Sequence, residues 1–253
     1  MYEIHAFHKS GSDFVFNYIM KLCKYEKFEL FSTNGDRQFC KDPNDYYNNN
    51  NRYKKNSVIC PLRLSNDFKK YDANVIYIIH FRNPIDTLIS EFYSYGYLHI
   101  TNRNNKQFNE FRQNIQNIGI DMYCIQQLIE TIAKYKVMFK WINENIQKNN
   151  VYISSYTEMK YNYPIWNKKM GEIFKLKPEI IYLLRKYFEN QMNNKPIDNL
   201  KIIDGTIKQG HIRNGQNKQY LTELKPETID IIKNEFNKII PNYLKNKYKD
   251  FDL

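Results

Sequence analysis

Cysteine is scarce in this chain of 253 residues, and long apolar runs are missing. The four cysteines lie far apart and form no Cys-x-x-Cys pair, which excludes the common zinc motifs and a disulfide-dense secreted scaffold. No apolar stretch reaches the roughly 18 residues that a membrane-spanning helix requires. No signal-peptide pattern precedes the first apolar run, which starts at Tyr2. These absences predict a cytoplasmic protein with reduced thiols and no membrane partner.

Acidic residues are fewer than basic ones: the chain has 27 Asp and Glu residues and 38 Lys and Arg residues, which gives a net charge of +11. Such a balance favours an anionic partner, either nucleic acid, a membrane surface or a polyphosphorylated small molecule. The basic residues are scattered and form no tail, which argues against nucleic acid. Tyrosine is abundant, with 22 residues. This excess could stack on a base or line an aromatic pocket, or it could reflect a drift toward Asn, Lys, Tyr and Ile.

Short apolar runs alternate with amphipathic segments along the chain. The run at 75–81 is almost entirely apolar, as a central parallel strand covered on both faces should be. The alternation predicts an α/β fold in a single domain over 1–253, with a central parallel sheet flanked by helices. The Asn-rich stretch at 32–56 is predicted to be a polar loop or lid. The expected strands are 2–7, 58–62, 75–81 and 151–154, and the expected helices are 14–22, 121–147, 164–174, 178–192 and 226–240, with another that starts at Asn83-Pro84.

The turn between the first expected strand and the first expected helix has the composition of a phosphate cradle. It combines a lysine, a glycine and small hydroxyl residues in the segment Lys9-Ser10-Gly11-Ser12-Asp13-Phe14. Backbone N–H groups and the positive end of the helix dipole would face an anion there. The lysine precedes the glycine, so the segment is not a Walker A motif.

Two later segments could also bind phosphate. Arg82 stands where the strand at 75–81 ends, and Ser90 follows eight residues later in the next expected helix. Ligands of open parallel sheets bind at this edge, and an arginine offers a planar fork to phosphate. The second segment, at 210–222, is a basic loop punctuated by glycine. Each segment alone could equally be structural, as an arginine that caps a strand, a serine packed in a helix, or an ordinary loop.

In their order, these segments resemble the cytosolic sulfotransferase family, which uses 3′-phosphoadenosine 5′-phosphosulfate. Lys9–Phe14 is similar to the family's Lys-Ser-Gly-Thr-Thr-Trp loop, and Arg82 with Ser90 matches its arginine and serine on the 3′-phosphate. The segment Arg213-Asn214-Gly215 is similar to its Arg-Lys-Gly loop. Tyr156 begins a segment like Tyr-Glu-Asp-Met-Lys, and Phe188 lies in one like Ser-Phe-Glu-x-Met; both family segments reach the adenine.

The resemblance implies in-line transfer of a sulfuryl group to a hydroxyl or amine of a small-molecule acceptor, with 3′-phosphoadenosine 5′-phosphate as product and no metal. It also implies a P-loop-like phosphosulfate-binding loop after the first strand. Lys9 would neutralise charge on the leaving phosphate, and the N–H groups from Ser10 to Ser12 would hold it. The implied cofactor-binding residues are Lys9, Ser10, Gly11, Ser12, Asp13, Phe14, Arg82, Ser90, Tyr156, Phe188, Arg213, Asn214 and Gly215.

Several residues depart from the family pattern. Asp13 replaces a threonine and should repel a phosphosulfate unless it turns outward or acts as a base, Phe14 replaces tryptophan, and Asn214 replaces lysine. The family's catalytic histidine should fall near 59–63, where no histidine occurs. The candidates for a general base are His8, Asp13, His99, Glu29 and Asp36. The family's C-terminal dimerisation motif is not found, so the oligomeric state stays open.

The acceptor pocket is expected in the segments 30–60, 92–120 and 195–212. Aromatic side chains there would suit a planar or apolar acceptor, although ordinary packing would explain them as well; they are Phe31, Tyr93, Tyr95 and Tyr97.

Three alternatives to an active sulfotransferase remain. A P-loop nucleotide kinase would share the sheet and the cradle, but it needs a Walker A motif and an acidic magnesium ligand. A non-catalytic protein that binds nucleotide or nucleic acid would fit the charge, but it leaves the Arg82 and Ser90 spacing unexplained. A relative that binds the nucleotide without turnover would fit Asp13 and the missing histidine.

Overall fold

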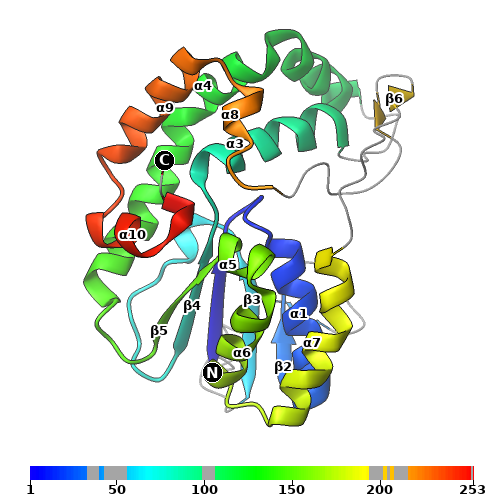
Figure 1. Cartoon of the computed structure of the whole chain (residues 1–253), viewed down its shortest axis with the longest axis vertical. Helices are drawn as coiled ribbons and strands as arrows, with labels where there is room; N and C mark the ends of the chain where they lie inside the picture. Colours follow the sequence, from blue (N-terminus) through cyan, green and yellow to red (C-terminus); the bar gives the residue numbers. More distant parts are fainter. Residues whose placement is uncertain are drawn as a thin grey trace. The chain divides into compact units, whose positions relative to one another are not determined.

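The computed structural model describes residues 1–32, 40–42, 56–98, 106–193, 202–203, 206–207, 216–251 and 253. The chain divides into two compact units (Figure 1). The sheet unit comprises Met1–Arg82 and Val137–Asn193, and the helical unit comprises Asn83–Lys136 and Asn194–Leu253. The single domain predicted over 1–253 stays a prediction, and most of the predicted loop or lid at 32–56 lies outside the described residues.

The sheet unit is built on five parallel strands in the order β2-β3-β1-β4-β5. This arrangement confirms the predicted α/β fold with a central parallel sheet. Because every strand runs the same way, the carboxyl ends of all five meet at one edge, where ligands of such sheets bind. The strands are β1 (Tyr2–Ala6), β2 (Glu29–Phe31), β3 (Ser57–Leu62), β4 (Ile76–Phe81) and β5 (Val151–Ser155).

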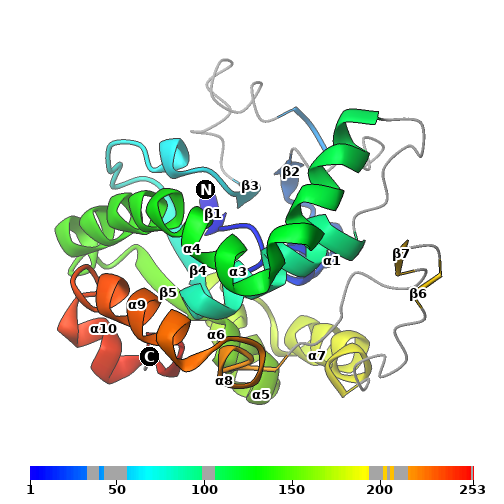
Figure 2. The same cartoon turned by 90° about the horizontal axis from the view of Figure 1, so that it is seen from above.

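One face of the sheet packs against helices α1 (Ser12–Glu26), α6 (Tyr163–Ile173) and α7 (Pro178–Asn193), which lie together in Figures 1 and 2. Side chains alternate along a strand, so Tyr2 and Ile4 of β1 share this face and join the main hydrophobic cluster. The Tyr2 ring stacks on Phe174, with 4.2 Å between the ring centroids.

The other face of β1 carries a buried polar pair under aromatic rings. Glu3 and His5 are both buried, and His5 Nε2 lies 3.6 Å from Glu3 Oε2. Phe68 stacks on His5 at 4.4 Å between centroids, and Trp141 packs on Tyr77 of β4 at 4.8 Å. The Trp141 indole N–H donates to the Lys69 carbonyl at 2.8 Å. The sheet is therefore covered on both faces, which explains the almost entirely apolar sequence of β4.

Helix α4 (Lys106–Asn145) belongs to both units and is longer than the 121–147 that the sequence predicted. It is interrupted at Gly119, whose φ of 74° and ψ of 170° are not helical. Apolar residues recur at helical spacing over 121–147, but two of them, Met122 and Ile129, are 53% and 82% exposed, so the buried face of α4 is shifted from the one that this spacing indicates. The side chains that α4 buries are Ile115, Tyr123, Cys124, Leu128, Thr131, Tyr135, Met138, Phe139, Trp141, Ile142 and Asn145.

The helical unit begins with α3 (Pro84–Tyr93), whose predicted start at Asn83-Pro84 is confirmed. Asn83 Oδ1 accepts hydrogen bonds from the N–H groups of Ile85 (2.9 Å) and Asp86 (3.1 Å), and Pro84 occupies the first turn. None of the described helices has both the length and the hydropathy of a membrane-spanning segment. The remaining elements among the described residues are η2 (Ser65–Asp67), η3 (Ser94–Leu98), α5 (Tyr156–Tyr161), β6 (Ile202–Ile203), β7 (Thr206–Ile207), α8 (Tyr220–Glu223), α9 (Pro226–Asn237), α10 (Asn242–Lys247) and η4 (Lys249–Phe251).

Ile4→Ala is expected to lower the free energy of unfolding by about 2–5 kcal/mol, because Ile4 lies fully buried in β1 between two paired strands. Urea unfolding followed by circular dichroism measures the change. Ile165→Ala on α6 is the matched control, since that side chain is 61% exposed and should change stability by less than about 0.5 kcal/mol. Equal losses in the two variants would contradict the assignment of this core.

Candidate functional site

The turn between β1 and α1 is closed by its own hydrogen bonds. The Ser10 N–H and hydroxyl both donate to the Phe7 carbonyl, at 3.2 and 2.7 Å. Lys9 and Gly11 have positive φ angles of 63° and 89°. The Gly11 carbonyl accepts the first bond of α1, so the N–H groups of residues 12–14 point from the helix start toward the turn. The Ser10 N–H is thus used within the turn, and an anion would meet N–H groups that begin one residue later than the sequence suggested.

Gly11 is also the point at which α5 approaches the turn. A Cβ atom at this position would lie 2.9 Å from Tyr156 Cδ2 and 3.0 Å from Met159 Cε. The φ angle of 89° is itself costly for any residue with a side chain. Glycine is therefore required here both by the backbone and by the space.

A chain of buried hydrogen bonds holds the Ser10 carbonyl from the two neighbouring strands. His80 of β4 pairs with Ser154 of β5; its Nε2 lies 2.8 Å from the Ser10 carbonyl oxygen and its Nδ1 lies 2.8 Å from Ser154 Oγ. A carbonyl can only accept, so Nε2 carries the proton and Nδ1 accepts from the Ser154 hydroxyl. Ser154 Oγ in turn accepts from the Trp166 indole at 2.8 Å. Because a trans peptide points its N–H opposite to its carbonyl, this chain directs the Gly11 N–H away from His80.

Arg82, the first residue after β4, stabilises the same turn through a hydrogen bond. Its Nη1 donates to the Lys9 carbonyl at 3.2 Å. Its guanidinium carbon lies 4.4 Å from the centroid of the Tyr156 ring, a distance suited to a cation–π contact. The structure therefore brings together four residues that the sequence assigned to one site, namely Lys9, Gly11, Arg82 and Tyr156.

Asp13, the second residue of α1, is bonded to an arginine that the sequence analysis did not consider. Arg63 directly follows β3, and its Nη2 lies 2.6 Å from Asp13 Oδ1. Arg63 thus stands in the stretch where the family's histidine was expected. Asp13 is not an isolated carboxylate beside the cradle.

Phe14 and Phe188 form part of one aromatic cluster on the sheet unit. Their ring centroids are 5.2 Å apart, and Phe14 also contacts Tyr163 and Trp166. Phe188 is only 1% exposed and packs against Tyr18 as well. Phe188 therefore packs against Phe14 within the core. The contact of Phe188 with an adenine stays a prediction.

The other predicted residues lie in the turn itself, elsewhere in the two units, or outside the described residues. His8 is exposed in the turn itself, and Glu29 of β2 forms an ion pair with Lys41. Phe31 is fully buried, so it presents no surface to an acceptor, contrary to the sequence expectation. Ser90 is partly buried in α3 of the helical unit. His99, Asp36, Arg213, Asn214 and Gly215 lie outside the described residues.

Sequence reasoning missed three residues around these segments: Arg63, His80 and Asp86. Asp86 is fully buried in α3 and accepts from the N–H groups of Lys218 (2.7 Å) and Tyr220 (3.4 Å), so it anchors the last part of the predicted basic segment at 210–222. The sequence did contain a signal for Arg63, because this arginine directly follows an expected strand, and ligands of parallel sheets bind at the carboxyl ends of the strands. His80 gave a weaker signal as the one polar side chain of an apolar strand.

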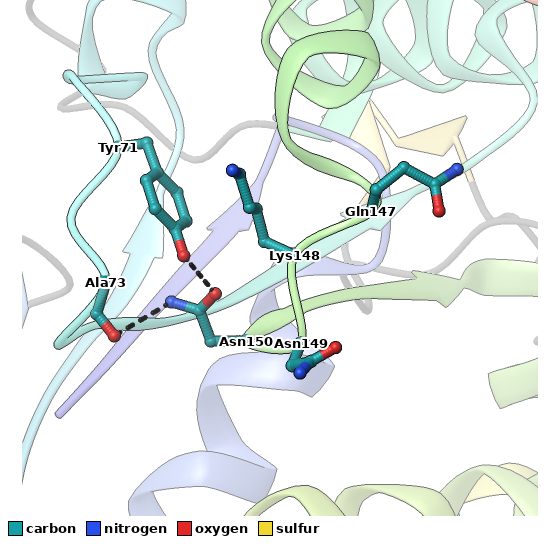
Figure 3. A pocket seen from close by; sticks show the side chains of 6 residues that line it. All are labelled: Tyr71, Ala73, Gln147, Lys148, Asn149 and Asn150. Atoms are coloured by element: carbon teal, nitrogen blue, oxygen red, sulfur yellow. Dashed lines mark hydrogen bonds between the residues drawn. The ribbon is translucent and has the colours of Figure 1, made fainter.

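A separate pocket of about 430 Å³ lies at the opposite edge of the sheet, before the start of β4 and β5. Figure 3 shows that three of its residues bond to one another: the Tyr71 hydroxyl donates to Asn150 Oδ1 at 2.6 Å, and Asn150 Nδ2 donates to the Ala73 carbonyl at 3.4 Å. These bonds hold the chain before the two strands. The pocket is lined by Tyr71, Ala73, Gln147, Lys148, Asn149 and Asn150.

A comparison with known protein families identifies the family of this chain. A family model described as "Sulfotransferase domain" matches residues 4–251. The chain belongs to the sulfotransferase family. It is therefore an enzyme of the class that transfers sulfuryl groups, and the kinase and non-catalytic alternatives are not favoured.

Among solved structures, the sulfotransferase chain is similar to the crystal structure of mouse sulfotransferase SULT7A1 complexed with PAP. The TM-score is 0.56 and the identity is 15%, over 95% of this chain and 84% of that one. At this identity the likeness shows the fold. A comparison with curated proteins finds no match. Within the described ranges, no three His, Cys, Asp or Glu side chains are grouped as a metal site requires.

Gly11→Ala is expected to destabilise the sulfotransferase more than Gly119→Ala, because both glycines have positive φ angles but only Gly11 lacks room for a Cβ. Backbone strain costs about 1–3 kcal/mol at either position, and the contact with Tyr156 adds to it at Gly11 alone. Urea unfolding compares the two variants. Equal losses would show that α5 moves freely away from the turn.

Burial lowers the pKa of His80 to about 4, although its bond to the Ser10 carbonyl opposes this shift. The unfolded chain takes up a proton near pH 6.5 that the native chain takes up only near pH 4, so stability is lost as the pH falls through this window. At pH 4.5 the loss should be about 2–3 kcal/mol relative to pH 7. His80→Gln, which can donate and accept but does not titrate, should remove this part of the pH dependence in urea unfolding. Parallel pH curves for the two proteins would contradict the neutral, buried state of His80.

Proposed function

We propose that this sulfotransferase moves a sulfuryl group from 3′-phosphoadenosine 5′-phosphosulfate to a hydroxyl or amine of a small-molecule acceptor. The observation that carries the proposal is the convergence of Lys9, the first turn of α1 and Arg82 on one strand-to-helix turn. The donor is suggested by the family and by the PAP in the similar mouse sulfotransferase. Nucleic acid is not expected as a partner.

Lys9 is proposed as the residue that stabilises the leaving group. In-line transfer of a sulfuryl group leaves negative charge on the oxygen that bridged sulfur and phosphorus. An ammonium group placed there, together with fixed N–H dipoles, stabilises charge that develops in the transition state. The bond that Arg82 donates to the Lys9 carbonyl fixes the backbone from which this ammonium extends.

The backbone N–H groups from Gly11 onward are proposed to hold the 5′-phosphate. Gly11, Ser12, Asp13 and Phe14 supply them, while Ser10 shapes the turn through its bonds to Phe7. The buried bond from His80 to the Ser10 carbonyl fixes the peptide that carries the Gly11 N–H. Donors that are already in place before the ligand arrives need no reorganisation during the reaction.

The rest of the nucleotide is proposed to bind the other residues that the family resemblance implies. Tyr156 would contact the adenine, and its ring is held by the Arg82 guanidinium. Phe188 is assigned to the same base. Arg82, Ser90 and the segment Arg213-Asn214-Gly215 are assigned to the 3′-phosphate, which would distinguish the donor from ATP.

His8 is the best proposal for a general base that removes the proton of a hydroxyl acceptor. It is exposed and directly precedes Lys9, whereas one oxygen of the alternative base Asp13 is engaged by Arg63. A positioned base contributes roughly 10²–10⁴-fold to such a reaction. An unchanged rate in His8→Gln would remove His8 from this role.

Thermal-shift titration with 3′-phosphoadenosine 5′-phosphate, ATP and AMP tests the proposed donor. The 3′-phosphorylated nucleotide at about 100 times its Kd should stabilise the protein by about 2.7 kcal/mol, and ATP or AMP at the same concentration should do much less. Lys9→Ala should weaken binding and lower sulfuryl transfer at least about 100-fold. Lys168→Ala, on the exposed face of α6, is the control and should change neither. An equal shift with ATP would contradict the proposed donor.

A further inference from the structure

Asp13 places a negative charge at the end of α1 where the proposed function needs an anion to bind. It is the single acidic residue between Phe7 and Phe14, and its side chain is 72% exposed. The positive end of a helix dipole attracts a carboxylate and a phosphate alike. A free Asp13 carboxylate would therefore compete with the 5′ end of the donor and repel it.

Arg63 is placed to remove this conflict. β1 and β3 are neighbouring parallel strands, with His5 opposite Leu62, so the residue that follows Leu62 comes out beside the turn after β1. The guanidinium reaches Asp13 with 2.6 Å between Nη2 and Oδ1, the length of a charge-assisted hydrogen bond.

The two partners differ in how firmly they are held. The Arg63 side chain is 16% exposed, whereas that of Asp13 is 72% exposed. The Arg63 side chain is therefore fixed by its surroundings in the protein, and it in turn holds the exposed Asp13 carboxylate in place. An exposed pair of this kind contributes little to stability, so its effect should be sought in the charge at the cradle.

We propose that Arg63 is a positioning residue of the donor site, which cancels the charge of Asp13 and holds that carboxylate beside β3 so that the 5′-phosphate can bind the start of α1. This inference rests on the proposed function. Arg63 acts through Asp13, so removing Asp13 should make Arg63 dispensable.

A double-mutant cycle tests this dependence with the Kd of 3′-phosphoadenosine 5′-phosphate measured by calorimetry. Arg63→Gln should weaken binding at least about tenfold, and Asp13→Asn should not weaken it by more than about threefold. The double variant should bind within about threefold of Asp13→Asn. Arg185→Gln is the control, because it removes an arginine from another carboxylate pair, with Glu189 on α7, and should leave the Kd unchanged.

A second ligand separates a local effect from a general structural one. Adenosine 3′-monophosphate lacks the 5′-phosphate, so its Kd should be the same in Arg63→Gln and in the wild type. Arg63→Lys keeps the charge and should bind the bisphosphate within about threefold of the wild type, which keeps the test open if Arg63→Gln fails to fold.

The outcomes also distinguish the inference from the proposed function. Failure of the wild type to bind the bisphosphate would overturn the proposed function and the inference with it. Tight binding by the wild type with an unchanged Arg63→Gln would overturn the inference alone. Equal losses in Arg63→Gln and in the double variant would do the same, because Arg63 would then act independently of Asp13.

Discussion

The orientation of one peptide group, between Ser10 and Gly11, is the constraint on which the rest of the site depends. Its carbonyl is fixed by His80, and its N–H belongs to Gly11, where α5 leaves no space for a side chain. The carbonyl of the preceding residue, Lys9, is fixed by Arg82. Strand β4, with the residue that follows it, and helix α5 are distant from the turn in the sequence but converge on two of its adjacent peptides. Such convergence is what a rigid donor site needs, because a loop alone would leave its dipoles free to turn.

The sheet and the approximate place of the site could be predicted from the sequence, because their signals are local. Each of these signals lies within a short stretch of sequence: the apolar run of β4, the helix start at Asn83-Pro84 and the lysine–glycine turn. The shifted face of α4 could not be read in this way. Met122 and Ile129 fit a helical period but are largely exposed, and which side of the helix is buried depends on partners elsewhere in the chain. The short strand β2 offers only three residues, too few for a periodic signal.

Two of the residues that the sequence missed, His80 and Arg63, act across strands. His80 faces Ser154 only because β4 and β5 pair in one register, and a shift by one residue would turn it to the other face of the sheet. Arg63 meets Asp13 only because β3 lies next to β1. Asp13 and Arg63 also mark two departures from the family pattern: Asp13 adds a carboxylate, and Arg63 lies in the stretch where the family's histidine was expected. In the sequence the two departures look unrelated, but in the structure the two side chains form a pair.

The buried chain from Trp166 through Ser154 and His80 to Ser10 has a further consequence for how the sequence can change. An indole N–H can only donate and a carbonyl can only accept, so the direction of every bond between them is set by the two ends. Loss of the Ser154 hydroxyl would take from the buried Trp166 indole N–H and from His80 Nδ1 the partner that each has here, which is costly. We therefore expect these positions to covary among relatives, so that the aromatic residue of α6, the hydroxyl of β5 and the imidazole of β4 are kept together or replaced together.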